Sequence, residues 1–472
     1  MMMKLTSVLA AGWITGAAAA LHGGAQRGII EPPCIAEAFC CLQACKFNDR
    51  ACKNAICSAH GHAVGHSYGD AHGDAHGDAH GHTHCDAHRH AHDHTHGHAD
   101  AGRAGYYWDC DGSGPCTLGS PCPTSALLVT GSEVACGSET DDNIPALAGG
   151  TFYGFGGNDS VDELFGGTFV GGDGSDAVDN LFGGYFYGGS GGDSVSDMHG
   201  GEFYGEGGND GVGRINGGAF YGGDGDDVVS TLKGLGGHYV GGEGADQVSF
   251  VMNGGVFEGG GGGDAVSEMK GGVFEGGGES DDVGVLFGGV FCGGEGVDSV
   301  GDMEGGIYDG GEGNDVVLTT MNGGTFLGGA GDDAVGELTG FGVFLGGDGD
   351  DAVEEMTDGA FYGGRGDDSV ALLYGGGVFY GGENGDRVIF MDAGTMVYGQ
   401  SGADSVEEMQ DGVVYGGDGD DFLGEGVGGE YFAGAGDDRA IVIEAGGMFD
   451  GGLGTDCFEN NNGGVVANAA PC

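Results

Sequence analysis

The chain has 472 residues, of which 118 are glycine, and its 74 acidic against 13 basic residues give a formal net charge of −61. This charge argues against nucleic acid as a partner, because phosphate backbones repel it, and favours bound cations. The glycine content without a strict three-residue period excludes collagen, and regularly recurring valines and aromatic residues argue against a wholly disordered chain.

Residues 1–20 are typical of a secretory signal peptide. Lys4 supplies the positive charge, LTSVLAAGWITGAAAA the apolar stretch, and Ala18–Ala20 a small-residue cleavage site. The apolar stretch is short and interrupted by glycine, and no other segment approaches its length. We therefore expect a secreted, extracellular protein with no membrane span in the mature chain.

Cysteines form two groups whose connectivity stays open. Residues 21–58 are predicted to be a small disulfide-rich module, and residues 106–148 a Cys-, Gly- and Pro-rich cap before the main array. Cys457 and Cys472 could close the C-terminal tail, residues 459–472. Cys85 and Cys292 lack obvious partners and are expected to be unpaired or intermolecular. The two groups are Cys34, Cys40, Cys41, Cys45, Cys52 and Cys57, and Cys110, Cys116, Cys122 and Cys136.

Residues 59–105 form a histidine-rich linker for which we expect no stable fold. Residues 60–98 hold 14 of the 17 histidines. Imidazole binds Zn2+ and Cu2+ well, but the spacing determines no single geometry and no HExxH pattern occurs. Two interpretations stay open, a metal-handling tract and a flexible linker whose histidines sense pH. The candidate Zn2+ or Cu2+ ligands are His80, His82, His84, His88, His90, His92, His94, His96 and His98.

Residues 149–458 repeat a unit of 17 or 18 residues, with one of 19 across the insertion GLGG near residue 235. Each copy reads GGxGxDxV, two or three residues, Leu or Met, one residue, GG, one residue, and Phe or Tyr. This pattern predicts two short strands joined by glycine turns, with side chains such as Val178, Leu181 and Phe186 pointing between the strands. Because so small a unit cannot bury a core alone, successive copies must stack as parallel strands about 4.8 Å apart.

The turn GGxGxDxV resembles the calcium-binding RTX, or haemolysin-type, repeat of parallel β-rolls. The segments GGDGSDAV (171–178), GGDGDDVV (222–229) and GGDGDDAV (346–353) carry this resemblance, which covers residues 151–458. It implies several Ca2+ ions, held between loops of successive turns by loop aspartates and backbone carbonyls. Only one half of each turn here carries GxD, so calcium sites are expected along one edge, at most about 17 between eighteen loops.

The predicted fold is all-β, a right-handed parallel β-roll or β-solenoid of about 18 turns, preceded by the disulfide-rich module and the histidine-rich linker. Carboxylate and carbonyl oxygens are the ligands that Ca2+ prefers, and turn formation alone does not require aspartate in every copy. The predicted calcium ligands are Asp159, Asp176, Asp193, Asp210, Asp227, Asp246, Asp264, Asp281, Asp298, Asp315, Asp333, Asp351, Asp368, Asp386, Asp404, Asp421, Asp438 and Asp456.

Five loops depart from the motif, and we expect weaker calcium sites in them. Glu279 and Asn384 replace the glycine of GxD. Phe155, Glu206 and Gln400 replace the second glycine of the pair.

These features favour a secreted calcium-binding repeat protein that folds on binding a file of Ca2+ ions and acts as an extracellular structural or adhesive rod. Its cell-surface or matrix partner is unknown. Residues 21–150, where a catalytic domain would lie, contain no GxSxG or zincin motif, so an enzyme is not expected. Two alternatives stay open. One is a haemolysin-type accessory or toxin-like protein, or a secreted enzyme with an unrecognised catalytic region, and the other is an extracellular metal-sequestering or mineral-associated protein that uses the histidine-rich tract.

Overall fold

The structure is a computed structural model that describes residues 128–132 and 134–472. The predictions for the signal peptide, the disulfide-rich module and the histidine-rich linker lie outside these residues. The described part contains 37 strands and no helix, hence no helix that could span a membrane. Its strands join in one continuous hydrogen-bonded system in which the paired strands run parallel. The predicted all-β parallel solenoid is therefore confirmed.

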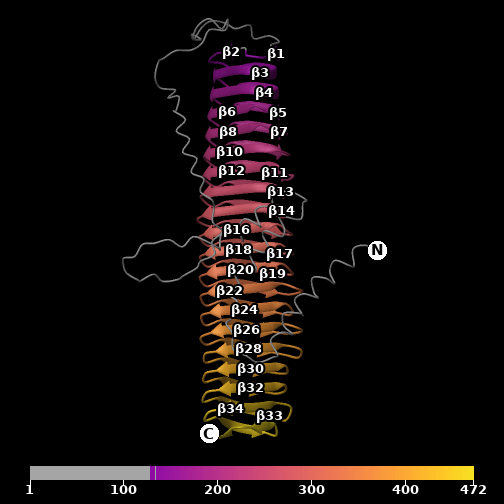
Figure 1. Ribbon diagram of the computed structural model, residues 1–472, viewed down its shortest axis with the longest axis vertical. Coiled ribbons are helices and arrows are strands. Elements are labelled where there is room, and N and C mark those ends of the chain that lie inside the picture. Colours follow the sequence, from indigo (N-terminus) through magenta and orange to yellow (C-terminus); the bar gives the residue numbers. More distant parts are fainter. Residues whose placement is uncertain (1–127, 133) are drawn as a thin grey trace, which may run out of the picture. The chain divides into compact units, whose positions relative to one another are not determined.

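Each turn of the solenoid contributes one strand to each of two stacks (Figure 1). We call them the valine stack, whose strands carry the Val and the Leu or Met of the repeat, and the aromatic stack, whose strands carry the Phe or Tyr. At the acidic edge, the GxD loop leads from the aromatic stack to the valine stack. At the glycine edge, the plain glycine turn leads back.

The valine stack consists of the odd-numbered short strands. They are β1 (Leu128–Val129), β5 (Ala177–Leu181), β7 (Ser194–Met198), β9 (Gly211–Ile215), β11 (Val228–Lys233), β15 (Asp282–Leu286), β17 (Ser299–Met303), β19 (Val316–Met321), β21 (Ala334–Leu338), β23 (Ala352–Met356), β25 (Ser369–Leu373), β27 (Arg387–Met391), β29 (Ser405–Met409), β31 (Phe422–Gly426), β33 (Arg439–Glu444), β35 (Cys457–Asn462) and β37 (Ala470–Pro471).

The aromatic stack consists of the even-numbered short strands, and four long strands run through the glycine edge into both stacks. The even-numbered strands are β2 (Val134–Cys136), β6 (Tyr185–Ser190), β8 (Glu202–Gly207), β10 (Gly218–Asp224), β12 (Gly237–Glu243), β16 (Val290–Glu295), β18 (Ile307–Glu312), β20 (Thr325–Ala330), β22 (Val343–Asp348), β24 (Ala360–Arg365), β26 (Val378–Glu383), β28 (Met396–Ser401), β30 (Val413–Asp418), β32 (Glu430–Ala435), β34 (Met448–Leu453) and β36 (Val465–Ala467). The long strands are β3 (Asn143–Gly156), β4 (Ser160–Asp173), β13 (Gln247–Gly261) and β14 (Ala265–Gly278).

The stack continues beyond residues 149–458 at both ends. At its start, β1 and β2 pair with β3, and at its end β36 and β37 pair with β34 and β35. The predicted disulfide between Cys457 and Cys472 is present, and Cys136 is also disulfide-bonded. Cys292 is buried and unpaired, as predicted.

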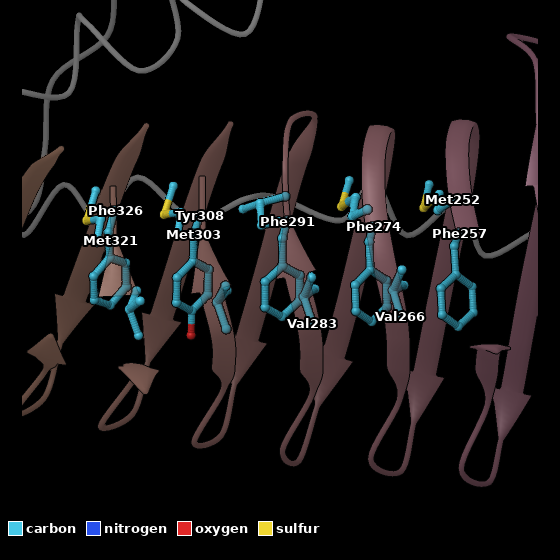
Figure 2. Close-up of a cluster of buried hydrophobic side chains, with 14 of the residues drawn as sticks. Met252, Phe257, Val266, Phe274, Val283, Phe291, Met303, Tyr308, Met321 and Phe326 are labelled. Carbon is cyan, nitrogen blue, oxygen red and sulfur yellow. The ribbon is translucent and has the colours of Figure 1, made fainter. Parts of the chain in front are cut away.

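The core is three side chains deep in each turn, and the predicted apolar positions fill it. Val266, Met269 and Phe274 are at most 1% exposed. Figure 2 shows Phe274 within a row of rings whose neighbouring centroids lie 4.5–4.9 Å apart between Phe257 and Phe326. Each stacked pair adds about 0.5–1.5 kcal/mol beyond the burial of its area. The ring stack therefore couples each turn to the next.

Turns longer than 17 residues place their extra residues away from the acidic edge. The 18-residue turn from Asp315 to Asp333 carries its extra residue in β19, inside the valine stack, where the register of β19 against β17 shifts between Val300 and Met303. In the 19-residue step, Leu235 at the glycine edge is 78% exposed. The aspartate register is thereby kept whatever the length of the turn.

The five residues that replace motif glycines adopt the left-handed backbone conformation. Their φ angles lie between 72° and 82°. A side chain in this conformation costs about 1–2 kcal/mol, because Cβ approaches the neighbouring carbonyl oxygen. The stack thus imposes the backbone geometry of the turn on four residues that disfavour it, Phe155, Glu206, Glu279 and Gln400, and on Asn384, whose residue type tolerates it better.

Replacing Glu279 by glycine is therefore expected to stabilise the protein by about 1 kcal/mol, since only the strain of the left-handed backbone is removed. The matched control is Val297→Gly, because Val297 is also an exposed loop residue but has no positive φ. The control should be neutral or destabilising. The melting temperatures of the two variants are measured in excess calcium. A shift of both melting temperatures in the same direction would contradict the strain argument.

Candidate functional site

The eighteen predicted aspartates form one continuous row, which we call the aspartate file. Each aspartate ends the GxD loop and lies one residue before the valine stack. All eighteen are buried, with at most 5% of their surface exposed. The stack thus brings together, one per turn, residues that are 17–19 positions apart in the chain.

One carboxylate oxygen of each aspartate is held by the neighbouring turn. The backbone N–H of Asp264 donates to Oδ1 of Asp281 at 2.7 Å, and that of Asp281 donates to Oδ1 of Asp298 at 2.8 Å. The same bond recurs along the whole file at 2.6–3.0 Å. These bonds orient every carboxylate in the same way.

The second carboxylate oxygen has no hydrogen-bond partner. In all eighteen turns of the file, Oδ2 is buried and makes no hydrogen bond. A buried ionised oxygen without a partner is costly, and native structures contain few such atoms. A row of eighteen therefore requires a bound cation or a proton at each oxygen.

The first glycine of each loop leaves room for this oxygen. A Cβ placed on Gly276 would lie 2.0 Å from Oδ2 of Asp281 and 2.8 Å from the carbonyl oxygen of Gly293, the equivalent glycine one turn later. Two oxygens thus converge beside a Cα that carries no side chain. Ala433 occupies this position in the turn of Asp438, so one methyl group is accommodated there. The second glycine has another role, because Gly277 adopts a φ of 119°.

Burial weakens the acidity of the file. Desolvation raises the pKa of the carboxyls from Asp159 to Asp438 to between about 6 and about 8, although the N–H bond from the neighbouring aspartate lowers it. Neighbouring carboxylates raise it further at positions such as Asp281 and Asp386. The ionised form is therefore disfavoured unless positive charge is supplied.

The oxygens of the file fit a hard cation with mixed ligands. Among residues 128–132 and 134–472, no group of three or more His, Cys, Asp or Glu side chains could hold a metal ion. A cation in the file would thus be held by Oδ2 of an aspartate and by backbone carbonyl oxygens such as that of Gly293. Ca2+ accepts this combination, because it takes six to eight oxygens in flexible geometry, whereas Mg2+ demands a compact octahedron and keeps its waters.

The structure adds one residue to the predicted file. The N–H of Asp142 donates to Oδ1 of Asp159 at 2.8 Å, so Asp142 occupies the preceding register. Its Oδ2 accepts hydrogen bonds from N and Oγ of Ser138, at 2.6 and 3.0 Å, and is therefore satisfied. The 17-residue spacing to Asp159, with Ile144 in the valine position, was the signal for this register. The candidate ligands from His80 to His98 lie outside the described residues.

Comparison with known proteins adds no relative to this description. No protein-family model matches the chain, and neither a curated protein nor a solved structure matches it.

Proposed function

We propose that this chain is a calcium-binding repeat protein whose solenoid folds on binding a file of Ca2+ ions along its acidic edge. The observation that carries the proposal is the buried, unpartnered Oδ2 repeated in eighteen consecutive turns. The aspartates from Asp159 to Asp456 supply one carboxylate ligand per turn, and glycine carbonyls of the next turn supply others. Bound calcium compensates the negative charge of ionised carboxylates, which burial alone disfavours.

Two further arguments support calcium rather than another cation. The resemblance of GGxGxD to haemolysin-type repeats concerns the loops that contain the aspartate file. Oxygen ligands without histidine or thiolate are typical of Ca2+ sites and atypical of zinc or copper sites.

We further propose that the protein is secreted and acts as an extracellular structural or adhesive rod. The disulfide between Cys457 and Cys472 supports an oxidising compartment, since cytosolic disulfides are rare. Extracellular calcium lies in the range in which such modules bind, with dissociation constants of about 0.1–1 mM. A stack of repeats whose length is set by their number suits a spacer or a scaffold.

The test is a calcium titration of the full chain at pH 7.5, followed by far-UV circular dichroism and by equilibrium dialysis with elemental analysis. The β spectrum is expected to appear cooperatively as calcium rises, and to disappear in EGTA. Stoichiometry should approach one ion per interval between loops, about 17 in total. An equal concentration of Mg2+ is the control and should not restore the spectrum.

Two results would contradict the proposal. An unchanged β spectrum in EGTA at this pH would show that the file needs no cation. A stoichiometry of only a few ions would restrict calcium to a few loops. The same elemental analysis reports any zinc or copper that the histidine-rich tract retains.

A further inference from the structure

Five neighbouring strands of the aromatic stack, β22, β24, β26, β28 and β30 (Figure 1), have no charged residue at the positions directly before and after their buried core residue. On either side of the buried core residue of each strand, one side chain faces outward. One row of these consists of Leu345, Tyr362, Tyr380, Tyr398 and Tyr415, aligned in register. The other row, two residues earlier in each strand, consists of Val, Ala, Val, Met and Val. We call the two rows the apolar stripe.

The tyrosines of the apolar stripe hold one another in place. Successive rings from Tyr362 to Tyr415 stack with centroids 4.6, 4.9 and 5.2 Å apart, and their planes are nearly parallel. Tyr362 and Tyr415 are 40% and 42% exposed. The stripe is therefore a rigid, flat surface whose side chains lose little further freedom on binding, which favours affinity.

The repeat does not require this surface to be uncharged. At the same outward positions in earlier turns, the chain places Glu202, His238, Glu258, Glu275 and Asp309. Those side chains occupy the same strand geometry over the same kind of core. Uncharged outward pairs also occur on β3, β4, β6, β10, β16 and β20, so what distinguishes β22 to β30 among the described strands is a run of five such strands with four tyrosines in one row.

Acidic side chains surround the apolar stripe. Along the acidic edge, exposed acidic residues end three of these strands, Asp348, Glu383 and Asp418, and along the glycine edge the turns before β24, β28 and β30 carry Asp358, Asp392 and Asp411. Arg365, at the end of β24, forms ion pairs with Asp348 and Glu383. A partner that covers the stripe therefore meets a negative border on which Arg365 is already engaged with acidic side chains.

A second copy of the chain is a poor occupant. Five strands about 4.8 Å apart and two rows about 7 Å apart give a face of about 170 Å2. A stable dimer needs about 800 Å2 from each partner, and the residues from 151 onward carry 59 acidic against six basic side chains. Both size and charge favour a smaller, cationic occupant.

We propose that the apolar stripe is a docking surface for a cationic polypeptide segment, whose apolar side chains pack on the two rows and whose Lys or Arg side chains reach the acidic border. Apolar contact on the rigid tyrosines supplies affinity, and the border supplies the choice of partner and the rate of encounter. The docked segment leaves the aspartate file, which faces the interior, untouched.

The probe is a synthetic nine-residue peptide of alternating lysine and leucine, titrated by fluorescence anisotropy onto the full chain in 2 mM CaCl2 and 150 mM NaCl. A peptide with serine in place of leucine measures attraction by charge alone, and one with glutamate in place of lysine measures apolar contact alone. The lysine–leucine peptide should bind at least about tenfold more tightly than either. Equal binding of the lysine–leucine and lysine–serine peptides would overturn the proposal.

Matched variants locate the site. Tyr380→Ser with Tyr398→Ser removes the middle of the stripe, and Tyr187→Ser with Tyr204→Ser removes an equivalent stacked pair, whose centroids lie 5.0 Å apart, outside it. Only the Tyr380→Ser/Tyr398→Ser variant should weaken binding of the lysine–leucine peptide, by about tenfold. Equal losses in both, or a dimer in sedimentation velocity that the first variant dissolves, would overturn the proposal.

A charge variant keeps the test independent of ring stacking. Val378→Lys places a cation in the stripe, and Val273→Lys places one at the same position of an earlier turn. Val378→Lys should repel the cationic peptide, whereas Val273→Lys should leave its binding within about twofold. An unchanged calcium-dependent β spectrum in each variant serves as the control that the solenoid is intact. Peptide binding that is unchanged in Val378→Lys would contradict the proposed docking on the apolar stripe.

Discussion

Without calcium, the solenoid is expected to be folded at pH 4 and to unfold as the pH rises above the unfolded-state pKa of its aspartates, before the pH reaches the folded-state values of about 6 to 8. In the folded state, burial raises the pKa of the file carboxyls from Asp159 to Asp438 to between about 6 and about 8, with Asp281, Asp333, Asp351 and Asp386 at about 8. In the unfolded chain the same groups titrate near pH 4. Between these values the folded state holds more protons than the unfolded state, so its stability falls as the pH rises.

The size of this effect exceeds the ordinary stability of a protein. Each shifted carboxyl lowers the free energy of unfolding by about 1.4 kcal/mol for each pH unit between its unfolded-state and folded-state pKa. A few such groups suffice to cancel a total stability of about 5–15 kcal/mol, and the file contains many. Calcium reverses the trend, because it binds the ionised carboxylates that accumulate as the pH rises.

Circular dichroism in EGTA from pH 4 to pH 8.5 measures the transition, and the same series in excess calcium is the control. Asp281→Asn should raise the calcium-free stability at pH 8 and leave it nearly unchanged at pH 4, since the amide needs no counter-ion. Asp282→Asn is the matched control, because Asp282 is exposed beside the file. A calcium-free solenoid that becomes more stable with rising pH would contradict the whole argument.

Removing one ring from the core is expected to destabilise the solenoid by about 4 kcal/mol, through lost burial and a cavity that the two neighbouring turns cannot fill. Phe274 is fully buried between Phe257 and Phe291, with ring centroids 4.7 and 4.9 Å away. Phe274→Ala therefore breaks the ring stack at one turn. Val273→Ala, at the preceding outward position of β14, should cost less than about 1 kcal/mol.

The same variant reports how many calcium ions bind in one cooperative step. Where calcium binding drives folding, a higher calcium concentration offsets a loss of stability. The more ions bind in one step, the smaller is the increase in calcium concentration needed to offset a given loss. A loss of about 4 kcal/mol shifts the calcium midpoint by about 1.5-fold for 17 coupled ions and by about tenfold for three. A tenfold shift would thus contradict a single cooperative file, and an equal shift for Val273→Ala would contradict the role of the ring stack.

Much of the fold could be predicted from the sequence, because residues at the same position of successive repeats must contact one another. Val178, Leu181 and Phe186 recur in phase, so each must meet its counterpart one turn away, and all three are buried. The glycine replacements were informative for the same reason. Glu279 and Gln400 stand where the pattern requires left-handed backbone, and they adopt it.

The ends of the stack were harder to predict than its middle. Asp142 occupies a register of the file although Ser138 and Thr140 replace two motif glycines in its loop. At the other end, β35 to β37 continue the stack beyond the last acidic loop. End turns are stacked on one side only, so their residues are less constrained. The repeat pattern in the sequence therefore ends before the solenoid does.

By itself the sequence determined the period, the buried apolar positions, the parallel stacking and the row of aspartates, because all of these follow from one unit repeated in phase. Only the tertiary structure decided that each carboxylate turns inward, with Oδ1 bound to the preceding turn and Oδ2 beside a glycine that leaves it room. It also decided that the outward tyrosines from Tyr362 to Tyr415 form one surface. These features depend on distances between successive turns, and such distances exist only once residues 17 or 18 positions apart lie side by side.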